Sequence, residues 1–233
     1  MKDGKMSKSV GNVVYPEDLI SRYGLDATKY YLLRLMGFSQ DSIFTPEDFV
    51  LRYNSDLAND LGNLLNRTIG MINKYFDGII PTKLEAKTEF DEDLRNVAKE
   101  QILKLEENMD NLHVSDAIQD LWKYISRTNK YIDETAPWVL SKEGKIEELK
   151  AVMFNLAEAL RKISILLTPY MPDTSKEILN QLGIDEKDAN WDNLLDYDTI
   201  KPETKIISQG KPLFARLDQD EEVEYIKSVM KGK

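Results

Sequence analysis

The feature that most constrains this sequence is a long run of helical periodicity between residues 45 and 77. Thr45 is a favoured N-cap residue, Pro46 suits the first helical position, and Asp77-Gly78 is a typical helix end. Apolar or small side chains recur three or four residues apart along the run, at Val50, Tyr53, Leu57, Leu61, Leu64, Leu65, Thr68, Ile72 and Phe76. A stripe of this kind has to be buried, so the run predicts a helix packed on a helical core.

Further helices are expected after residue 78. Similar periodicity marks residues 90–109, 115–133, 145–167 and 173–182, and Gly183 closes the last of them. The residues before 45 form a short irregular opening, and residues 184–217 are polar and irregular until Glu221–Met230 suggests a final short helix. The fold class that we expect is all-α, a bundle of helices preceded by a small module.

The same pattern divides the chain into three expected parts. They are a connective module at 1–44, an α-helical bundle at 45–200, and a C-terminal extension with a short helix at 201–233. With 233 residues and 42% hydrophobic content, the chain can bury a core for one or two domains.

Composition excludes several classes of site. The chain has no cysteine and a single histidine, His113, so we expect neither a disulfide framework nor a metal site. No apolar run approaches the roughly 20 residues that a membrane helix needs. A cytoplasmic setting fits these features.

The formal net charge of -10 argues at first sight against a nucleic-acid partner. The charge is unevenly distributed, because residues 1–34 hold six Lys or Arg against four acids while residues 85–112 hold nine acids against four bases. RNA bound to such a chain would depend on base contacts more than on backbone charge.

The first chemical signal is the loop sequence Lys5-Met6-Ser7-Lys8-Ser9. Gly4 and Gly11 flank it and leave it pliant, and its lysines and hydroxyls could stabilise charge on a triphosphate. By composition alone, a stretch of Lys, Ser and Gly near a terminus would be an ordinary solvated loop. It resembles, however, the KMSKS loop of class I aminoacyl-tRNA synthetases, and residues 24–34 resemble the segment that follows this loop in the same class.

That resemblance implies an ATP site at Lys5, Met6, Ser7, Lys8 and Ser9. Lys8 would be the main catalytic contact to ATP, with Lys5 in support and Mg²⁺ accompanying the nucleotide. The family's second ATP motif, His-x-Gly-His, needs two histidines, and His113 is the only one here. We therefore expect His113 to be a surface residue at a helix end. The chain would be a part of a longer enzyme, holding half of the ATP site and inactive alone.

A row of polar side chains marks the long helix. Asn59, Asn63 and Arg67 are four residues apart and would line the side roughly opposite Leu61 and Leu65. Amide and guanidinium groups can read base edges, although an ordinary solvated helix face would have the same spacing.

A second feature, Ala136-Pro137-Trp138, follows the 115–133 helix. Trp138 could belong to the core or serve as a platform for an unstacked base. Trp122 and Trp191 are candidates for the core.

Together these features resemble the anticodon-reading signature of methionyl-tRNA synthetases. In that family an Asn-x-x-x-Arg helix and a Pro-Trp pair contact the CAU anticodon, which here implies Asn63, Arg67 and Trp138, with Asn59 in support. The implied partners are initiator and elongator tRNA(Met), ATP and methionine. The resemblance also implies that the connective module at 1–44, which carries the KMSKS loop, contacts the stem of the tRNA. The family's zinc knuckle and its appended dimerising domain are not found in the sequence, so a monomer is expected. Alternatives are the same region of another class I synthetase or a non-catalytic helical scaffold.

Overall fold

The computed structural model describes most of the chain as helices. The described residues are 6, 12–37, 42–82, 88–197 and 199–231. Within them, the remaining regular structure amounts to one isolated antiparallel bridge between Ile79 and Lys205. The expected all-α fold is confirmed.

One continuous helical rod forms the frame of the molecule. It consists of α3 (Pro46–Arg52), the π-helical segment η2 (Tyr53–Gly62) and α4 (Asn63–Phe76). Thr45 caps its start by accepting a hydrogen bond from the Asp48 amide at 3.2 Å. The rod confirms the helix expected between residues 45 and 77.

The middle of the rod differs from the helix that the sequence predicts. Over η2 the hydrogen bonds close wider i to i+5 turns, so residues four or five apart come to lie on one face. Tyr53, Leu57, Leu61 and Gly62 are its buried residues. The sequence spacing alone was compatible with an ordinary α-helix, and the wider turn became visible only in the structure.

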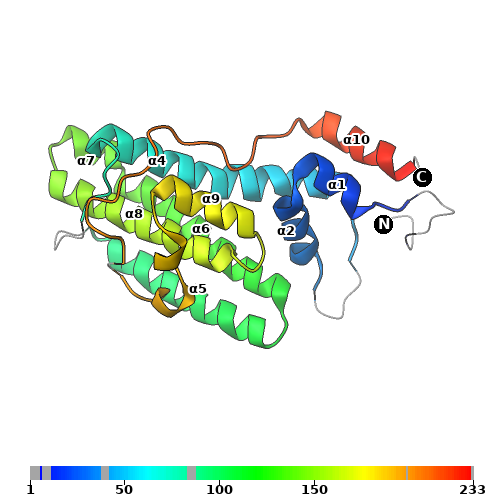
Figure 1. The fold of residues 1–233 in the computed structure, drawn as a ribbon, viewed down its shortest axis with the longest axis horizontal. Helices are drawn as coiled ribbons and strands as arrows, with labels where there is room; N and C mark the ends of the chain where they lie inside the picture. Colours follow the sequence, from blue (N-terminus) through cyan, green and yellow to red (C-terminus); the bar gives the residue numbers. More distant parts are fainter. Residues whose placement is uncertain (1–5, 7–11, 38–41, 83–87, 198, 232–233) are drawn as a thin grey trace.

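The other helices pack around the rod as a bundle (Figure 1). They are α5 (Asp91–Asp110), α6 (Val114–Thr135), α7 (Pro137–Lys142), α8 (Ile146–Leu167) and α9 (Pro172–Leu182). The predicted segments are therefore confirmed, with α7 as an addition. α8 is the central helix, since nearly all of its residues from Leu149 onward are buried.

The expectation of an irregular opening was wrong. The described part of this region contains α1 (Pro16–Tyr23) and α2 (Leu25–Leu35), which meet at Gly24 with φ 86°. Helices this short are marginal in isolation, so their sequence periodicity is a weak signal. Burial of Leu19, Tyr30 and Tyr31 against the rest of the chain stabilises them.

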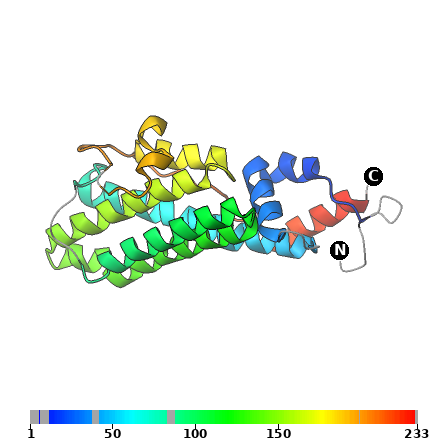
Figure 2. The same cartoon turned by 90° about the horizontal axis from the view of Figure 1, so that it is seen from below.

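The C-terminal segment returns along the rod to this module. After two 3₁₀ turns, η3 (Glu186–Asp188) and η4 (Trp191–Asn193), an extended stretch leads to α10 (Gln219–Lys231). α10 packs on α3, and the views in Figures 1 and 2 place it beside the module formed by α1 and α2.

Three buried charges of α8 hold the 193–200 turn. Glu158 accepts a 2.8 Å bond from Arg161 Nε and a 3.1 Å bond from the Ile200 amide. Lys162 donates to the carbonyl oxygens of Leu194 and Asp196. Because each buried ion is hydrogen-bonded, its desolvation is offset and the turn is fixed on the bundle.

Lys162 provides a test of this arrangement. Burial, together with the nearby Arg161 charge, lowers the pKa of Lys162 from 10.5 to about 8. Between these two values the unfolded chain binds the proton that the folded chain has released, so the unfolding free energy should rise with pH by about 1–3 kcal/mol. Urea unfolding at pH 7.5, 8.5 and 9, below the pH at which the tyrosines of the unfolded chain ionise, should reveal the rise in the wild type and its loss in Lys162→Met. Lys150→Met, at a more exposed lysine of the same helix, should keep it; parallel curves for wild type and Lys162→Met would contradict the assignment.

A second polar cluster joins α10 to α1. Arg22 donates to both carboxylate oxygens of Glu222, at 2.6 Å and 2.8 Å, and the Tyr23 hydroxyl donates to the same carboxylate at 2.6 Å. Arg22 also lies over the Tyr225 ring, 4.1 Å from its centroid. This bidentate pair docks the C-terminal helix on the N-terminal module.

The docking should depend on pH through Glu222. The hydrogen bond from Arg22 lowers the pKa of Glu222 below its usual 4.5, so the stabilisation is complete above that value and is lost as the pH falls through the lower folded-state pKa. Thermal unfolding should therefore separate Glu222→Gln from wild type most at neutral pH and least below about pH 4. Glu221→Gln is the matched control, because Glu221 is exposed and reaches Arg22 only at 3.4 Å.

Candidate nucleic-acid interface

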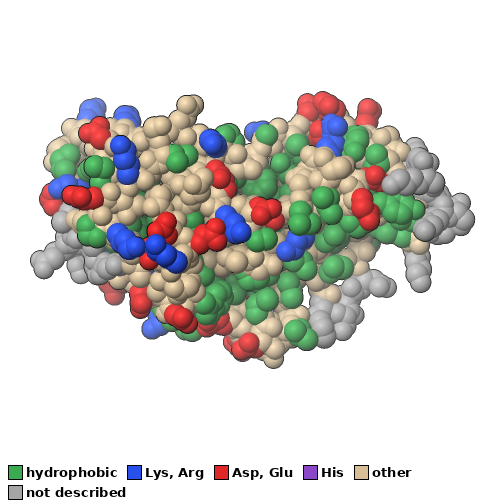
Figure 3. Space-filling view, viewed as in Figure 1, with side chains coloured by type: hydrophobic (Ala, Val, Ile, Leu, Met, Phe, Trp, Pro, Cys, Tyr) green, Lys and Arg blue, Asp and Glu red, His purple; other side chains and the backbone are tan. Residues whose placement is uncertain are grey.

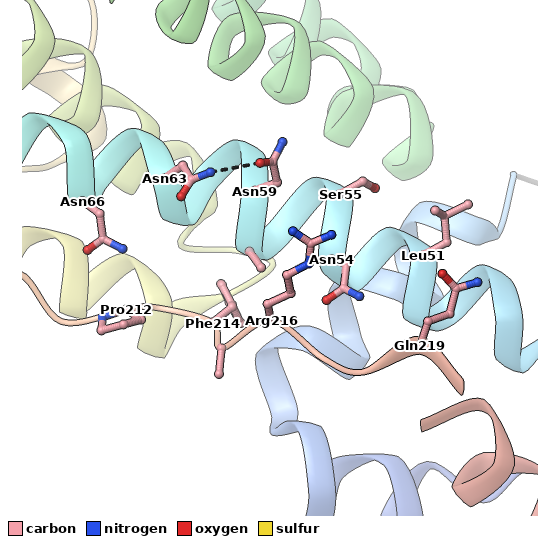
Figure 4. Close-up of a pocket in the computed structure, with 12 residues that line it drawn as sticks. Leu51, Asn54, Ser55, Asn59, Asn63, Asn66, Pro212, Phe214, Arg216 and Gln219 are labelled. Atoms are coloured by element: carbon pink, nitrogen blue, oxygen red, sulfur yellow. Dashed lines mark hydrogen bonds between the residues drawn. The ribbon is translucent and has the colours of Figure 1, made fainter. Parts of the chain in front are cut away.

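The polar row of the rod faces solvent at the junction of η2 and α4. Asn59 lies in the last turn of η2, and Asn63 is the first residue of α4. Asn63 Nδ2 donates to Asn59 Oδ1 at 2.9 Å (Figure 4), and both side chains are exposed. Asn59 Nδ2 also donates to Asp60 Oδ1 at 3.3 Å. Because an amide carries two N–H donors, the pair still offers the second hydrogen of Asn59 Nδ2 and the acceptor Asn63 Oδ1 to a ligand.

Arg67 connects this row to α6. One turn beyond Asn63, its guanidinium donates to Asp133 Oδ1 at 2.7 Å. The side chains of Arg67 and Asp133 are 37% and 65% exposed, so the ion pair is solvated and can exchange partners. The structure therefore brings the rod and the end of α6 together at Arg67.

Trp138 lies five residues after Asp133 in the chain. α6 ends where Ala136 adopts the left-handed conformation with φ 41°, and Pro137 starts α7 at its favoured first position. Pro137 is buried and anchors the turn, whereas Trp138 is 49% exposed. Of the two alternatives for Trp138, the exposed platform fits the structure better than a core position.

The other two tryptophans differ from each other. Trp122 is buried beside Tyr30, with ring centroids 4.4 Å apart, as expected for a core residue. The expectation for Trp191 was wrong, since it is 43% exposed and donates from Nε1 to Glu106 at 2.9 Å. The polar 184–193 turn carries Trp191 over the surface rather than into the bundle. His113 lies exposed at the start of α6, as expected.

The charge around the row is nearly balanced. Asp133 neutralises Arg67, and burial, together with the Asp56 charge, raises the pKa of the neighbouring Asp60. On the molecular face in Figure 3, Lys and Arg are interspersed with Asp and Glu instead of forming a continuous basic patch. Such a surface favours base contacts over strong phosphate binding.

A hollow of about 600 Å³ borders the same row, and the sequence analysis did not anticipate it (Figure 4). Asn59 and Asn63 line it from the rod, while Phe214 and Arg216 line it from the returning C-terminal stretch. Asn54 fixes that stretch by two hydrogen bonds to the Leu217 backbone, at 3.0 Å and 2.9 Å. No local sequence signal indicates that residues 212–219 return to the rod, because this contact spans more than 150 residues.

The predicted phosphate loop is mostly outside the described residues. Met6 is described and is exposed, whereas Lys5, Ser7, Lys8 and Ser9 are not. Among the described residues there is no cluster of His, Asp and Glu suited to a metal ion. No helix in the described ranges is long and apolar enough to cross a membrane.

Two protein-family descriptions match successive parts of the chain. Residues 1–69 match the class I tRNA synthetases (M), and residues 80–232 match the anticodon-binding domain of methionyl-tRNA ligase. Asn59, Asn63 and Arg67 fall within the first match and Trp138 within the second.

Curated relatives cover the whole chain. It is 56% identical over 234 residues to methionine–tRNA ligase from Bacillus subtilis and 55% identical to that from Listeria innocua. The Lactococcus lactis ligase is 56% identical over 237 residues. The chain spans about a third of the length of these relatives, 35% in each case.

Solved structures agree with the sequence matches. Mycobacterium tuberculosis methionyl-tRNA synthetase in complex with methionyl-adenylate superposes with a TM-score of 0.83 at 32% identity, covering 91% of this chain and 42% of that one. The apo form gives a TM-score of 0.81 at 29% identity, over 88% and 41% of the two chains. The chain thus belongs to the methionyl-tRNA synthetase family of class I aminoacyl-tRNA synthetases and contains its anticodon-binding domain.

Proposed function

We propose that this chain binds the CAU anticodon of tRNA(Met), within a ligase that joins methionine to that tRNA with ATP. One arrangement carries the proposal: the exposed Asn59–Asn63 pair, Arg67 beside it, and Trp138 just beyond the α6 residue that Arg67 contacts. The family membership supports the same proposal, since the relatives are methionine–tRNA ligases.

Each side chain has a distinct role in the proposed complex. Trp138 stacks the cytosine of the splayed anticodon loop, because its exposed indole offers an apolar face to an unpaired base. Asn63 and Arg67 supply the hydrogen bonds that distinguish base edges, and Asn59 orients Asn63 through the 2.9 Å bond. Arg67 exchanges Asp133 for RNA acceptors when the anticodon loop binds.

The remaining parts of the proposal concern the larger enzyme. Lys5 and Lys8 of the phosphate loop, with Met6, Ser7 and Ser9, contribute half of an ATP site, and Mg²⁺ accompanies the nucleotide. This part rests on the loop motif and on the class I match to residues 1–69. Initiator and elongator tRNA(Met) and methionine are the further partners, the chain acts as a monomer, and the setting is the cytoplasm. The rod that carries Asn63 and Arg67 also contacts α2 and α10, and the module of α1 and α2 follows the loop motif in the chain.

Anticodon stem-loops provide the direct test. Two RNAs that differ only in CAU against a scrambled triplet should be titrated into the chain while tryptophan fluorescence is followed. Asn63→Ala and Trp138→Ala should each reduce the preference for CAU by about 1–3 kcal/mol, since each removes one base contact.

Matched control variants distinguish a loss of anticodon recognition from a general effect of substituting an exposed side chain. Trp191 is exposed to a similar extent as Trp138, and Asn180 is an exposed helical asparagine, so Trp191→Ala and Asn180→Ala should leave the preference intact. If the CAU preference survives in both Asn63→Ala and Trp138→Ala, the assignment of the reading surface is wrong.

The ion pair of Arg67 gives a second prediction. Asp133→Asn removes a negative charge from the interface and frees the guanidinium, so both stem-loops should bind several-fold more tightly at low salt, with a smaller gain at 200 mM salt. Glu100→Gln is the control, because Glu100 forms a comparably exposed pair with Lys104 at 2.6 Å on α5. Unchanged or weaker binding by Asp133→Asn would show that Asp133 does not compete with RNA for Arg67.

A further inference from the structure

Asn129 of α6 forms a hydrogen bond to the rod that the proposed function does not use. Its Nδ2 donates to the backbone carbonyl oxygen of Asp60 at 3.0 Å, and also to that of Ile125, one turn earlier in its own helix, at 3.3 Å. Asp60 lies in η2, directly after Asn59. A helix interior satisfies its carbonyl oxygens internally, so a side chain that binds one from a neighbouring helix is an additional contact between the two elements.

The contact falls where the backbone of the rod is unusual. Turns of the i to i+5 kind are rare and occur frequently at functional sites. Gly62 shows how tightly this turn is packed, since a Cβ atom there would lie 3.1 Å from the carbonyl oxygen of Leu57, five residues earlier. A glycine within the segment and an asparagine on the facing helix therefore both fit the wide turn.

α6 holds the polar row at two points. Asn129 and Asp133 are four residues apart, so they lie on the same face of α6, about 6 Å apart along its axis. Asn129 holds the Asp60 carbonyl, next to Asn59, at one end of the row. At the other end, Asp133 accepts from Arg67 at 2.7 Å. Because α6 also packs on both η2 and α4, the two ends of the row are fixed relative to one helix.

From Asp60, hydrogen bonds continue along the surface to Asn63. Asn59 Nδ2 donates to Asp60 Oδ1 at 3.3 Å, and Asn63 Nδ2 donates to Asn59 Oδ1 at 2.9 Å (Figure 4). An ionised carboxylate can only accept, so Asp60 fixes which end of the Asn59 amide points toward it, and Asn59 in turn fixes the amide of Asn63. A short series of contacts therefore leads from α6 to the amide that is proposed to contact a base.

We propose that Asn129 is a positioning residue for anticodon recognition, which holds η2 through the Asp60 carbonyl and thereby keeps Asn59 and Asn63 in the orientation that receives a base. The inference rests on the proposed function, because it concerns the same polar row. Asn129 is half-buried between α6 and the rod, so it acts through the backbone that carries the two amides. Without it, the turn that bears Asn59 can move relative to α4, and the bond between Asn59 and Asn63 is loosened.

A double-mutant cycle on stem-loop binding tests the inference. Asn129→Ala should lower the ratio of CAU to scrambled binding by about two- to tenfold, which is the range that corresponds to one hydrogen bond. In the background of Asn63→Ala the same substitution should change the ratio by less than about twofold, because Asn129 acts through Asn63. In the background of Trp138→Ala the loss should persist, since Trp138 lies on α7, outside this series of contacts.

Asn73→Ala is the matched control. Asn73 is also half-buried and also donates from Nδ2 to two carbonyl oxygens, that of Ile69 one turn earlier at 3.0 Å and that of the distant Ile207 at 2.9 Å. Asn73→Ala and Asn129→Ala therefore remove the same kind of contact and should lower the melting temperature by similar amounts. Asn73→Ala should nevertheless leave the ratio of CAU to scrambled binding unchanged.

The side-chain amide signals of Asn59 and Asn63 provide a readout without RNA. In proton–nitrogen correlation spectra these signals are assigned by their disappearance in Asn59→Ala and Asn63→Ala. Both should shift toward the positions of solvated amides in Asn129→Ala and stay unchanged in Asn73→Ala. A purely structural role of Asn129 would lower the melting temperature without this selective shift.

The possible failures are distinguishable. An unchanged ratio of CAU to scrambled binding in Asn129→Ala would overturn the inference and leave the proposed function standing. A lower ratio with unmoved amide signals, or an equal loss with and without Asn63→Ala, would also overturn it, since Asn129 would then act by another route. No CAU preference in the wild type would overturn the proposed function, and the amide signals would still decide whether Asn129 orients the Asn59–Asn63 pair.

Discussion

The rod from Pro46 to Phe76 is the constraint on which the rest of the structure depends. The buried stripe of the rod forms part of the core, and this burial fixes the rotation of the rod about its axis. The opposite side of the rod therefore always faces solvent. Asn59, Asn63 and Arg67 lie on that side. The π-helical segment η2 sets the local register just before Asn63, because a wider turn shifts every following side chain around the axis. The buried core stripe and the proposed ligand-binding row are thus on opposite faces of the same element.

The protein combines an acidic body with a proposed RNA surface that is nearly neutral. Arg67 is paired with Asp133, so the guanidinium of the polar row does not stand unopposed. Weak phosphate attraction makes selectivity depend on base contacts and on the placement of individual donors. Balanced charges also limit the binding of unrelated RNA, since non-specific binding is dominated by the backbone term.

Distant segments are joined mainly by polar contacts with a defined geometry. The Arg22–Glu222 pair links residues 200 positions apart, and Glu158, Arg161 and Lys162 fix the 193–200 turn on α8. Buried ions contribute less net stability than apolar packing of the same volume, but they require one arrangement of their partners. These contacts attach the irregular segment between α9 and α10 to the bundle, and the stretch from 212 to 219 lines a hollow beside the polar row.

The sequence by itself determined the helical class, the boundaries of the long helices, the solvent-facing Asn59–Asn63–Arg67 row and the family resemblance, because periodicity, caps and short motifs are local properties. It left Trp138 undecided between core and surface, assigned Trp191 to the core, and missed α1 and α2. Only the tertiary structure decided these points and the hollow beside the polar row, because they depend on contacts between residues far apart in the chain. Burial of an indole, the stability of an eight-residue helix and the pairing of Arg67 with Asp133 are set by what packs nearby, which no local pattern encodes.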